Sequence, residues 1–163
     1  MELAPAPRFI PRRILVPLDF SPSSDAALEM ATDLAQHFHA ALHLVHVVPM
    51  FPLDKGTEFF SGVKFFDNAA LLEGVKTNTD QHLAPCLSAL ISRGIEASSS
   101  IEVGNDVAGN IVIEREHIDM VVISTHGISG WHPVIFGSVA EKVIKLVKCP
   151  LLLLRSVKAP GNP

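Results

Sequence analysis

The sequence lacks most of the features that identify common functional classes. Its two cysteines, Cys86 and Cys149, are far apart and in apolar surroundings. This indicates neither a disulfide framework nor a CxxC metal or redox pair, and we expect buried, inert thiols. The 13 basic and 17 acidic residues form no long run of either sign, which argues against a general DNA- or RNA-binding protein.

Long apolar runs are also lacking. No stretch approaches the roughly 20 consecutive apolar residues that cross a bilayer, and residues 1–11 lack the apolar centre of a secretory signal. The sequence therefore predicts no membrane association and a cytoplasmic location. A length of 163 residues with 48% hydrophobic content is typical of one domain. We place this domain at residues 12–156, between flexible segments at 1–11 and 157–163.

Hydrophobic patterning predicts strands that alternate with helices. Apolar runs typical of buried strands lie at 14–18, 42–48, 119–123 and 151–154, with a weaker strand at 97–103. Helical spacing predicts helices at about 22–39, 67–93 and 107–117, and a last helix after Gly137. Ser21 with Pro22 and Gly94 mark a helix start and a helix end. The alternation predicts an α/β fold, with an open, mainly parallel sheet of five strands and helices on both faces.

Ligands of such sheets bind beyond the carboxyl ends of the strands, where the strand order reverses. The two candidate places are Asp19, after the first strand, and Ser124, after the fourth. Asp19 could accept a hydrogen bond from a ribose hydroxyl or an adenine amino group. Alternatively it caps the following helix, and the two roles are compatible.

A loop with several glycines connects the fourth strand to the last helix. Gly127, Gly130 and Gly137 would let the backbone approach a ligand closely, and N–H groups at the helix start favour a phosphate. Ser138 adds a hydroxyl donor, and His126 could donate to a phosphate oxygen. The alternative is a tight βα turn without a ligand, in which His126 bonds its own backbone.

Several catalytic motifs are missing. The chain contains no GxxxxGK[ST] sequence, no GxGxxG after the first strand, and no GxSxG with a following acid and histidine. These absences argue against a P-loop NTPase, a dinucleotide dehydrogenase and a dedicated hydrolase. The histidines predict no metal site, because His37 and His39 end a helix while His43 and His46 point to opposite faces of a strand.

Several segments together resemble the universal stress protein family over about residues 12–155. They are Ile14 to Asp19 followed by a serine-rich helix start, Leu44 to Val47, Gly104-Asn105, Thr125 to Gly127, Gly137 to Val143, and Cys149-Pro150. The resemblance implies the Rossmann-like fold of the adenine nucleotide alpha hydrolase type. It also implies a stress-response module that binds ATP, ADP or AMP, with or without Mg²⁺.

The resemblance also implies which residues contact the nucleotide. Those that would enclose the adenosine are Pro17, Leu18, Asp19, Leu42 and Ile123. Those that would contact the phosphates and ribose are Gly127, Gly130, Gly137, Ser138 and Val139.

One position departs from the family pattern of Gly, two residues, Gly, nine residues, Gly, then Ser or Thr. Ser124 stands where the nucleotide-binding branch has its first glycine. Either the added side chain reduces nucleotide affinity, or the backbone accommodates serine. The resemblance further implies a homodimer through the final strand, Leu151–Leu154, which could equally be an ordinary buried strand. The alternative functions are a nucleotide-free dimeric interaction protein and a slow ATPase.

Overall fold

A computed structural model describes residues 9–48, 68–113, 118–125 and 137–155 of the chain. The predicted flexible ends and the unassigned 50–66 connection lie mostly or wholly outside these residues. The elements in chain order are β1 (Arg13–Pro17), α1 (Pro22–Phe38), β2 (Ala41–Val48), α2 (Asn68–Ser92), β3 (Ala97–Val103), α3 (Val107–Ile113), β4 (Met120–Ser124), α4 (Ser138–Leu146) and β5 (Leu151–Leu154).

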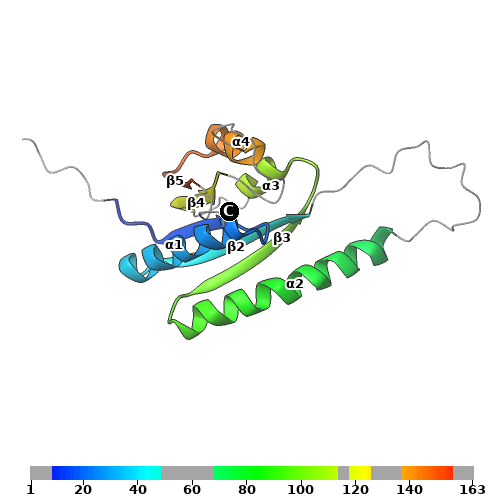
Figure 1. Ribbon diagram of the computed structural model, residues 1–163, viewed down its shortest axis with the longest axis horizontal. Coiled ribbons are helices and arrows are strands. Elements are labelled where there is room, and N and C mark those ends of the chain that lie inside the picture. Colours follow the sequence, from blue (N-terminus) through cyan, green and yellow to red (C-terminus); the bar gives the residue numbers. More distant parts are fainter. Residues whose placement is uncertain (1–8, 49–67, 114–117, 126–136, 156–163) are drawn as a thin grey trace, which may run out of the picture.

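The five strands form one parallel sheet in the order β3-β2-β1-β4-β5. The chain builds the sheet from β1 towards β3 and then crosses back, so that β4 lies beside β1 (Figure 1). The predicted α/β fold with a five-stranded parallel sheet is confirmed. The order of the strands reverses between β1 and β4.

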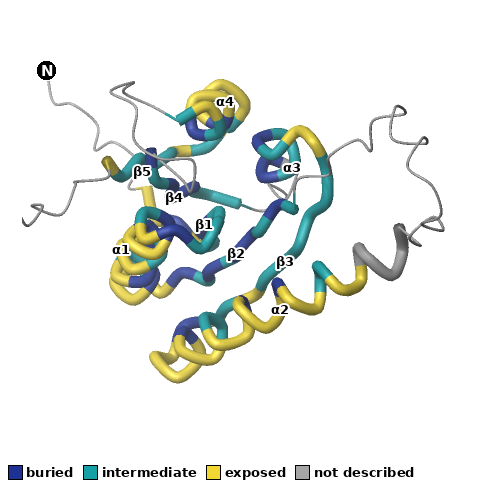
Figure 2. Tube along the Cα trace, turned by 45° about the vertical axis from the view of Figure 1, so that its right-hand side comes forward, coloured by how far each residue is buried: buried dark blue, intermediate teal, exposed yellow. Residues whose placement is uncertain are grey.

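Helices cover both faces of the sheet (Figure 1). One face packs against α1 and α2 through residues such as Ile14 and Val16, whereas the opposite face packs against α3 and α4 through residues such as Leu15. This alternation follows from the two-residue period of strand side chains. The central strands are buried on both faces (Figure 2), which explains their uninterrupted apolar sequences.

Local signals in the sequence fix the ends of α1. Ser21 is the N-cap, and its side chain accepts a hydrogen bond from the Ser24 N–H at 3.2 Å. Pro22 occupies the first turn, where its missing N–H costs nothing. His39 ends the helix in the left-handed conformation with φ 55°. The predicted helix at 22–39 is therefore confirmed to within one residue.

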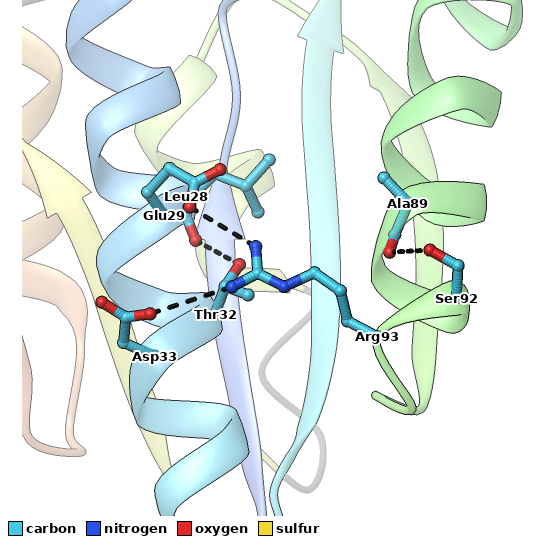
Figure 3. Close-up of polar contacts among 7 residues, drawn as sticks. All are labelled: Leu28, Glu29, Thr32, Asp33, Ala89, Ser92 and Arg93. Atoms are coloured by element: carbon cyan, nitrogen blue, oxygen red, sulfur yellow. Dashed lines mark hydrogen bonds and ion pairs between the residues drawn. The ribbon is translucent and has the colours of Figure 1, made fainter.

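Helix α2 spans 25 residues with Pro85 inside it, and Gly94, at φ +77°, follows its end as predicted. Thr79, Leu83 and Leu90 are buried, while the outward side is exposed (Figure 2). Arg93, the residue after the helix, reaches α1 (Figure 3). Its Nη1 lies 3.4 Å from Oε2 of Glu29, and its Nη2 lies 3.9 Å from Oδ1 of Asp33. Such exposed ion pairs contribute at most about 1 kcal/mol, so the buried side chains hold α2 in place.

The cysteines differ from expectation in one respect. Cys86 and Cys149 are half-buried rather than fully buried. Desolvation is the main cause that raises the pKa of each thiol, which lowers the fraction of reactive thiolate. Within the part of the chain that the structure describes, no three His, Cys, Asp or Glu side chains are grouped as metal ligands. No helix among those residues is long and apolar enough to span a membrane.

Leu90 and Ile91 provide a matched test of how α2 is held. Leu90 is 3% exposed and Ile91 is 60% exposed, although they are adjacent in the same helix. We expect Leu90→Ala to lower the free energy of unfolding by about 2–5 kcal/mol, because it leaves a cavity. Ile91→Ala should change it by no more than about 0.5 kcal/mol. Urea denaturation measures both, and equal effects would contradict this packing of α2.

Candidate functional site

A cavity of about 270 Å³ lies at the carboxyl ends of β1 and β4, on the face that α3 and α4 cover. The strands pair through Ile14 with Met120 and Leu15 with Val121, so the segments that follow them meet at the same edge. The residues that line the cavity are Pro17, Leu18, Asp19, Ser24, Val45, Val47, Val107, Ile111, Ile123, Ser124, Thr125, Gly137, Ser138, Val139 and Ala140. Both places predicted for a ligand therefore border one cavity.

The lining has an apolar and a polar set of residues. Val45 and Val47 of β2 and Val107 and Ile111 of α3 supply aliphatic surface. The polar set comes from the segments after β1 and β4 and from the start of α4, and consists of Asp19, Ser24, Ser124, Thr125 and Ser138. A pocket with apolar walls and a few polar groups is typical of small-molecule sites.

Asp19 lines the cavity and also stabilises the start of α1. Its Oδ1 accepts hydrogen bonds from the Ser21 N–H at 3.1 Å and the Ser21 hydroxyl at 2.6 Å. Ser21 in turn caps α1 through the Ser24 N–H. Asp19 therefore supports the cap of α1 through Ser21, and these hydrogen bonds help to fix the carboxylate at the cavity edge.

The turn that carries Asp19 has an unusual backbone. Phe20 has φ 60°, a left-handed conformation that is rare for a bulky side chain. Its ring packs against His46, with 4.7 Å between centroids, and against His82 of α2 at 5.3 Å. His46 Nδ1 lies 2.7 Å from the Leu18 carbonyl oxygen, which accepts its proton. These contacts of Phe20 and of the Leu18 carbonyl oxygen stabilise the turn at residues 18–20 and so help to position Asp19.

The start of α4 differs from that of α1. Gly137 is its N-cap and provides no side-chain hydrogen bond. The Gly137 N–H donates to the Thr125 carbonyl oxygen at 2.6 Å, which holds the start of α4 beside the end of β4. The next three residues, Ser138 to Ala140, all line the cavity. Because N–H groups in a first helical turn have no acceptor within the helix, they can serve an anion in the cavity.

The position of Ser124 resolves one of the alternatives left open by the sequence. It is the last residue of β4 and pairs with Leu154 of β5. The described non-glycine residues with positive φ are Phe20 and His39 only. The backbone at Ser124 therefore has no need of glycine, and serine is accommodated there. Its side chain lines the cavity, so any effect on a ligand must come from the space and polarity of that side chain.

The structure brings most, but not all, of the predicted site residues together. Those that line the cavity are Pro17, Leu18, Asp19, Ile123, Ser124, Gly137, Ser138 and Val139. Leu42 does not reach it, because it is the second residue of β2 and packs with Ile14 on the α1 and α2 face. His126, Gly127 and Gly130 lie outside the described residues.

Sequence reasoning missed several lining residues. Val45 and Val47 replace Leu42 as the contribution of β2 to the cavity. The signal was available, since alternate residues near the carboxyl end of this strand must point to one face. Sequence reasoning also missed Val107 and Ile111 of α3, and the buried Thr125 that directly follows Ser124.

Two curated proteins are similar to this chain over most of their length. Universal stress protein YxiE from Bacillus subtilis is 28% identical over 153 residues, which cover 88% of this chain and 98% of that protein. Universal stress protein MJ0531 from Methanocaldococcus jannaschii is 26% identical over 152 residues, which cover 90% of this chain and 84% of that protein.

Solved structures share the fold at lower identity. Hypothetical protein MJ0577 is 23% identical with a TM-score of 0.77, and the match covers 93% of this chain and 100% of that one. A universal stress protein from Archaeoglobus fulgidus in complex with dAMP has a TM-score of 0.56 at 21% identity, covering 89% and 98% of the two chains. Another universal stress protein in complex with cAMP has a TM-score of 0.56 at 18% identity, covering 90% and 98%.

The family model of the universal stress proteins matches residues 11–155. This range includes every described strand and helix and every residue that lines the cavity. Sequence and architecture therefore agree, and the chain belongs to the universal stress protein family.

Proposed function

We propose that this chain binds ATP or a related adenine nucleotide in the cavity between β1 and β4 and serves as a stress-response or regulatory module. The observation that carries the proposal is the start of α4, where Ser138, Val139 and Ala140 line the cavity and no side chain caps the helix. An uncapped helix start favours an anion through its N–H groups and the helix dipole.

The rest of the lining suits the other parts of a nucleotide. The aliphatic residues of β2 and α3 offer a surface on which a purine can be buried. Asp19 can accept a hydrogen bond from a ribose hydroxyl or the adenine amino group. The two family members in complex with dAMP and cAMP support an adenine nucleotide as the ligand class.

The chemistry of the cavity favours binding over catalysis. The described lining residues include no histidine, cysteine or lysine that could act as a base or nucleophile. Any Mg²⁺ would arrive on the nucleotide phosphates, and hydrolysis would be slow. We also propose a cytoplasmic location for the chain, because adenine nucleotides are abundant in the cytoplasm.

Gly137→Val provides a selective test of nucleotide binding. Gly137 has φ −68° and ψ 153°, a conformation that valine adopts without strain, so the added side chain should fill cavity space and leave the backbone unchanged. We expect the wild-type protein to bind an adenine nucleotide in isothermal titration, and Gly137→Val to lower the affinity at least tenfold.

Gly74→Val is the matched control, because an added Cβ at that exposed helical position meets nothing within 4 Å. It should leave the affinity unchanged. Absence of adenine nucleotide from the supernatant of heat-denatured protein, together with no binding at millimolar nucleotide, would contradict the proposal. It would favour the nucleotide-free interaction protein instead.

We further propose that the chain forms a homodimer through β5. This strand pairs with β4 only, among the described strands, and its four leucines are all partly exposed. An apolar strand at the edge of a sheet is prone to pair with another chain. A second copy would bury both its leucines and its remaining backbone hydrogen-bonding groups.

Amide hydrogen exchange tests the dimer without a substitution. We expect the amides of residues 151–154 to gain protection as protein concentration rises, because dimer formation would cover them. Amides of β3, at the opposite edge of the sheet, should gain no such protection at short exchange times, because the proposed interface does not cover them. Sedimentation velocity showing a monomer at every concentration would refute the interface.

A further inference from the structure

The cavity has a feature that bears on how many phosphates its ligand carries. Asp19 is the one ionisable residue among the fifteen described residues that line it. The polar lining residues otherwise offer hydroxyl groups and backbone N–H groups, which carry no net charge. The described lining residues therefore place one carboxylate in the cavity and offer a ligand phosphate no cationic side chain.

The sequence shows that this lack of cations extends well beyond the lining. The 41 residues from Ile14 to Asp54, which include β1, α1 and β2, contain no lysine or arginine. The segment from Ile118 to Glu141, which includes β4 and the start of α4, contains none either. Both segments that border the polar part of the cavity are thus free of lysine and arginine throughout.

The lysines of α4 do not supply the missing charge, because Lys142 and Lys145 are exposed and neither lines the cavity. Lys145 is paired with Glu141, with 2.7 Å between Nζ and Oε1. That hydrogen bond is the main cause that lowers the pKa of Glu141, so this carboxylate in the first turn stays ionised. Asp25, in the first turn of α1, adds another exposed acidic side chain near the start of a helix.

We propose that the ligand of this cavity is an adenosine monophosphate and that the cavity discriminates against metal-free ATP; this rests on the nucleotide binding proposed above. The positive end of a helix dipole corresponds to about half an elementary charge, whereas a phosphate monoester carries about −1.5 to −2 at pH 7. One phosphate already exceeds what α4 provides. The β- and γ-phosphates of ATP add further negative charge, and the described lining residues offer no cationic side chain to balance it.

Isothermal titration with AMP and ATP in EDTA tests the proposal directly. We expect AMP to bind at least tenfold more tightly than metal-free ATP. The ratio of the two affinities should shrink as ionic strength rises, because salt screens repulsion between charges. It should also shrink with Mg²⁺, which neutralises part of the triphosphate.

Asp19→Asn identifies the source of the discrimination. The amide oxygen of asparagine can still accept from Ser21, but the negative charge is gone. We expect the ATP-to-AMP ratio of dissociation constants to fall at least threefold, whatever happens to the affinity for AMP. The control is Asp33→Asn, which makes the same change in charge at an exposed residue of α1 outside the cavity, and it should leave the ratio unchanged.

The possible results separate the two proposals. Metal-free ATP binding as tightly as AMP would overturn the preference for a monophosphate and leave nucleotide binding intact. An unchanged ratio in Asp19→Asn would overturn the role of this carboxylate and with it the charge-based explanation. No binding of either nucleotide would overturn the proposed function itself, and this inference with it.

Discussion

The arrangement of the cavity depends on the reversal of strand order between β1 and β4. The connection after β1 leads into α1 on one face of the sheet, whereas the connection after β4 leads into α4 on the opposite face. Because neighbouring strands send their connections in opposite directions, a crevice opens at their carboxyl ends. Asp19 and the N–H groups at the start of α4 come together there, although more than 100 residues separate them in the chain. Each face of the sheet has its own hydrophobic core. The site therefore arises from the order of the strands and not from any single motif.

Much of this organisation could be predicted from the sequence because the responsible signals are local. Continuous apolar runs gave the strands to within one or two residues, and Ser21, Pro22 and Gly94 marked the ends of helices where the structure has them. The rule for ligand sites in parallel sheets then indicated Asp19 and Ser124. The contribution of β2 could not be obtained in the same way. Leu42 and Val45 are equally apolar, so composition does not separate them. Their places along β2 do, because Val45 lies nearer the carboxyl end and on the opposite face from Leu42. The left-handed conformation of Phe20 was also beyond prediction, since it depends on packing against His46 and His82.

A chain can use glycine because the backbone needs a positive φ or because a side chain would fill needed space. Ser124 and Gly137, the two described positions of the glycine motif, show which reason applies here. Gly137 has φ −68°, and Ser124 lies in an extended strand, so neither backbone requires a residue without a side chain. What matters at both is the room left in the cavity and the hydrogen bonds made at its edge. At Gly137 the missing side chain leaves the first turn of α4 uncapped. At Ser124 a small hydroxyl takes some of that room but adds a group that can donate to a ligand. The departure from the family pattern therefore alters the shape and polarity of the cavity without straining the fold.

The balance of charges suggests how such a cavity would discriminate among nucleotides. A helix start contributes only about 0.3–2 kcal/mol to the binding of an anion, and hydroxyl groups contribute about 0.5–1.5 kcal/mol per hydrogen bond. In the proposed complex, most of the binding free energy would then come from burial of the base against the aliphatic residues of β2 and α3. That contribution is the same for every adenine nucleotide, so it cannot distinguish them. Selectivity would instead arise from what the proposed site disfavours, namely excess negative charge in a cavity that already holds the Asp19 carboxylate. A specific site does not need strong attraction for its ligand if competing ligands are penalised. In the proposed complex the penalty would follow from the absence of lysine and arginine between Ile14 and Asp54 and between Ile118 and Glu141.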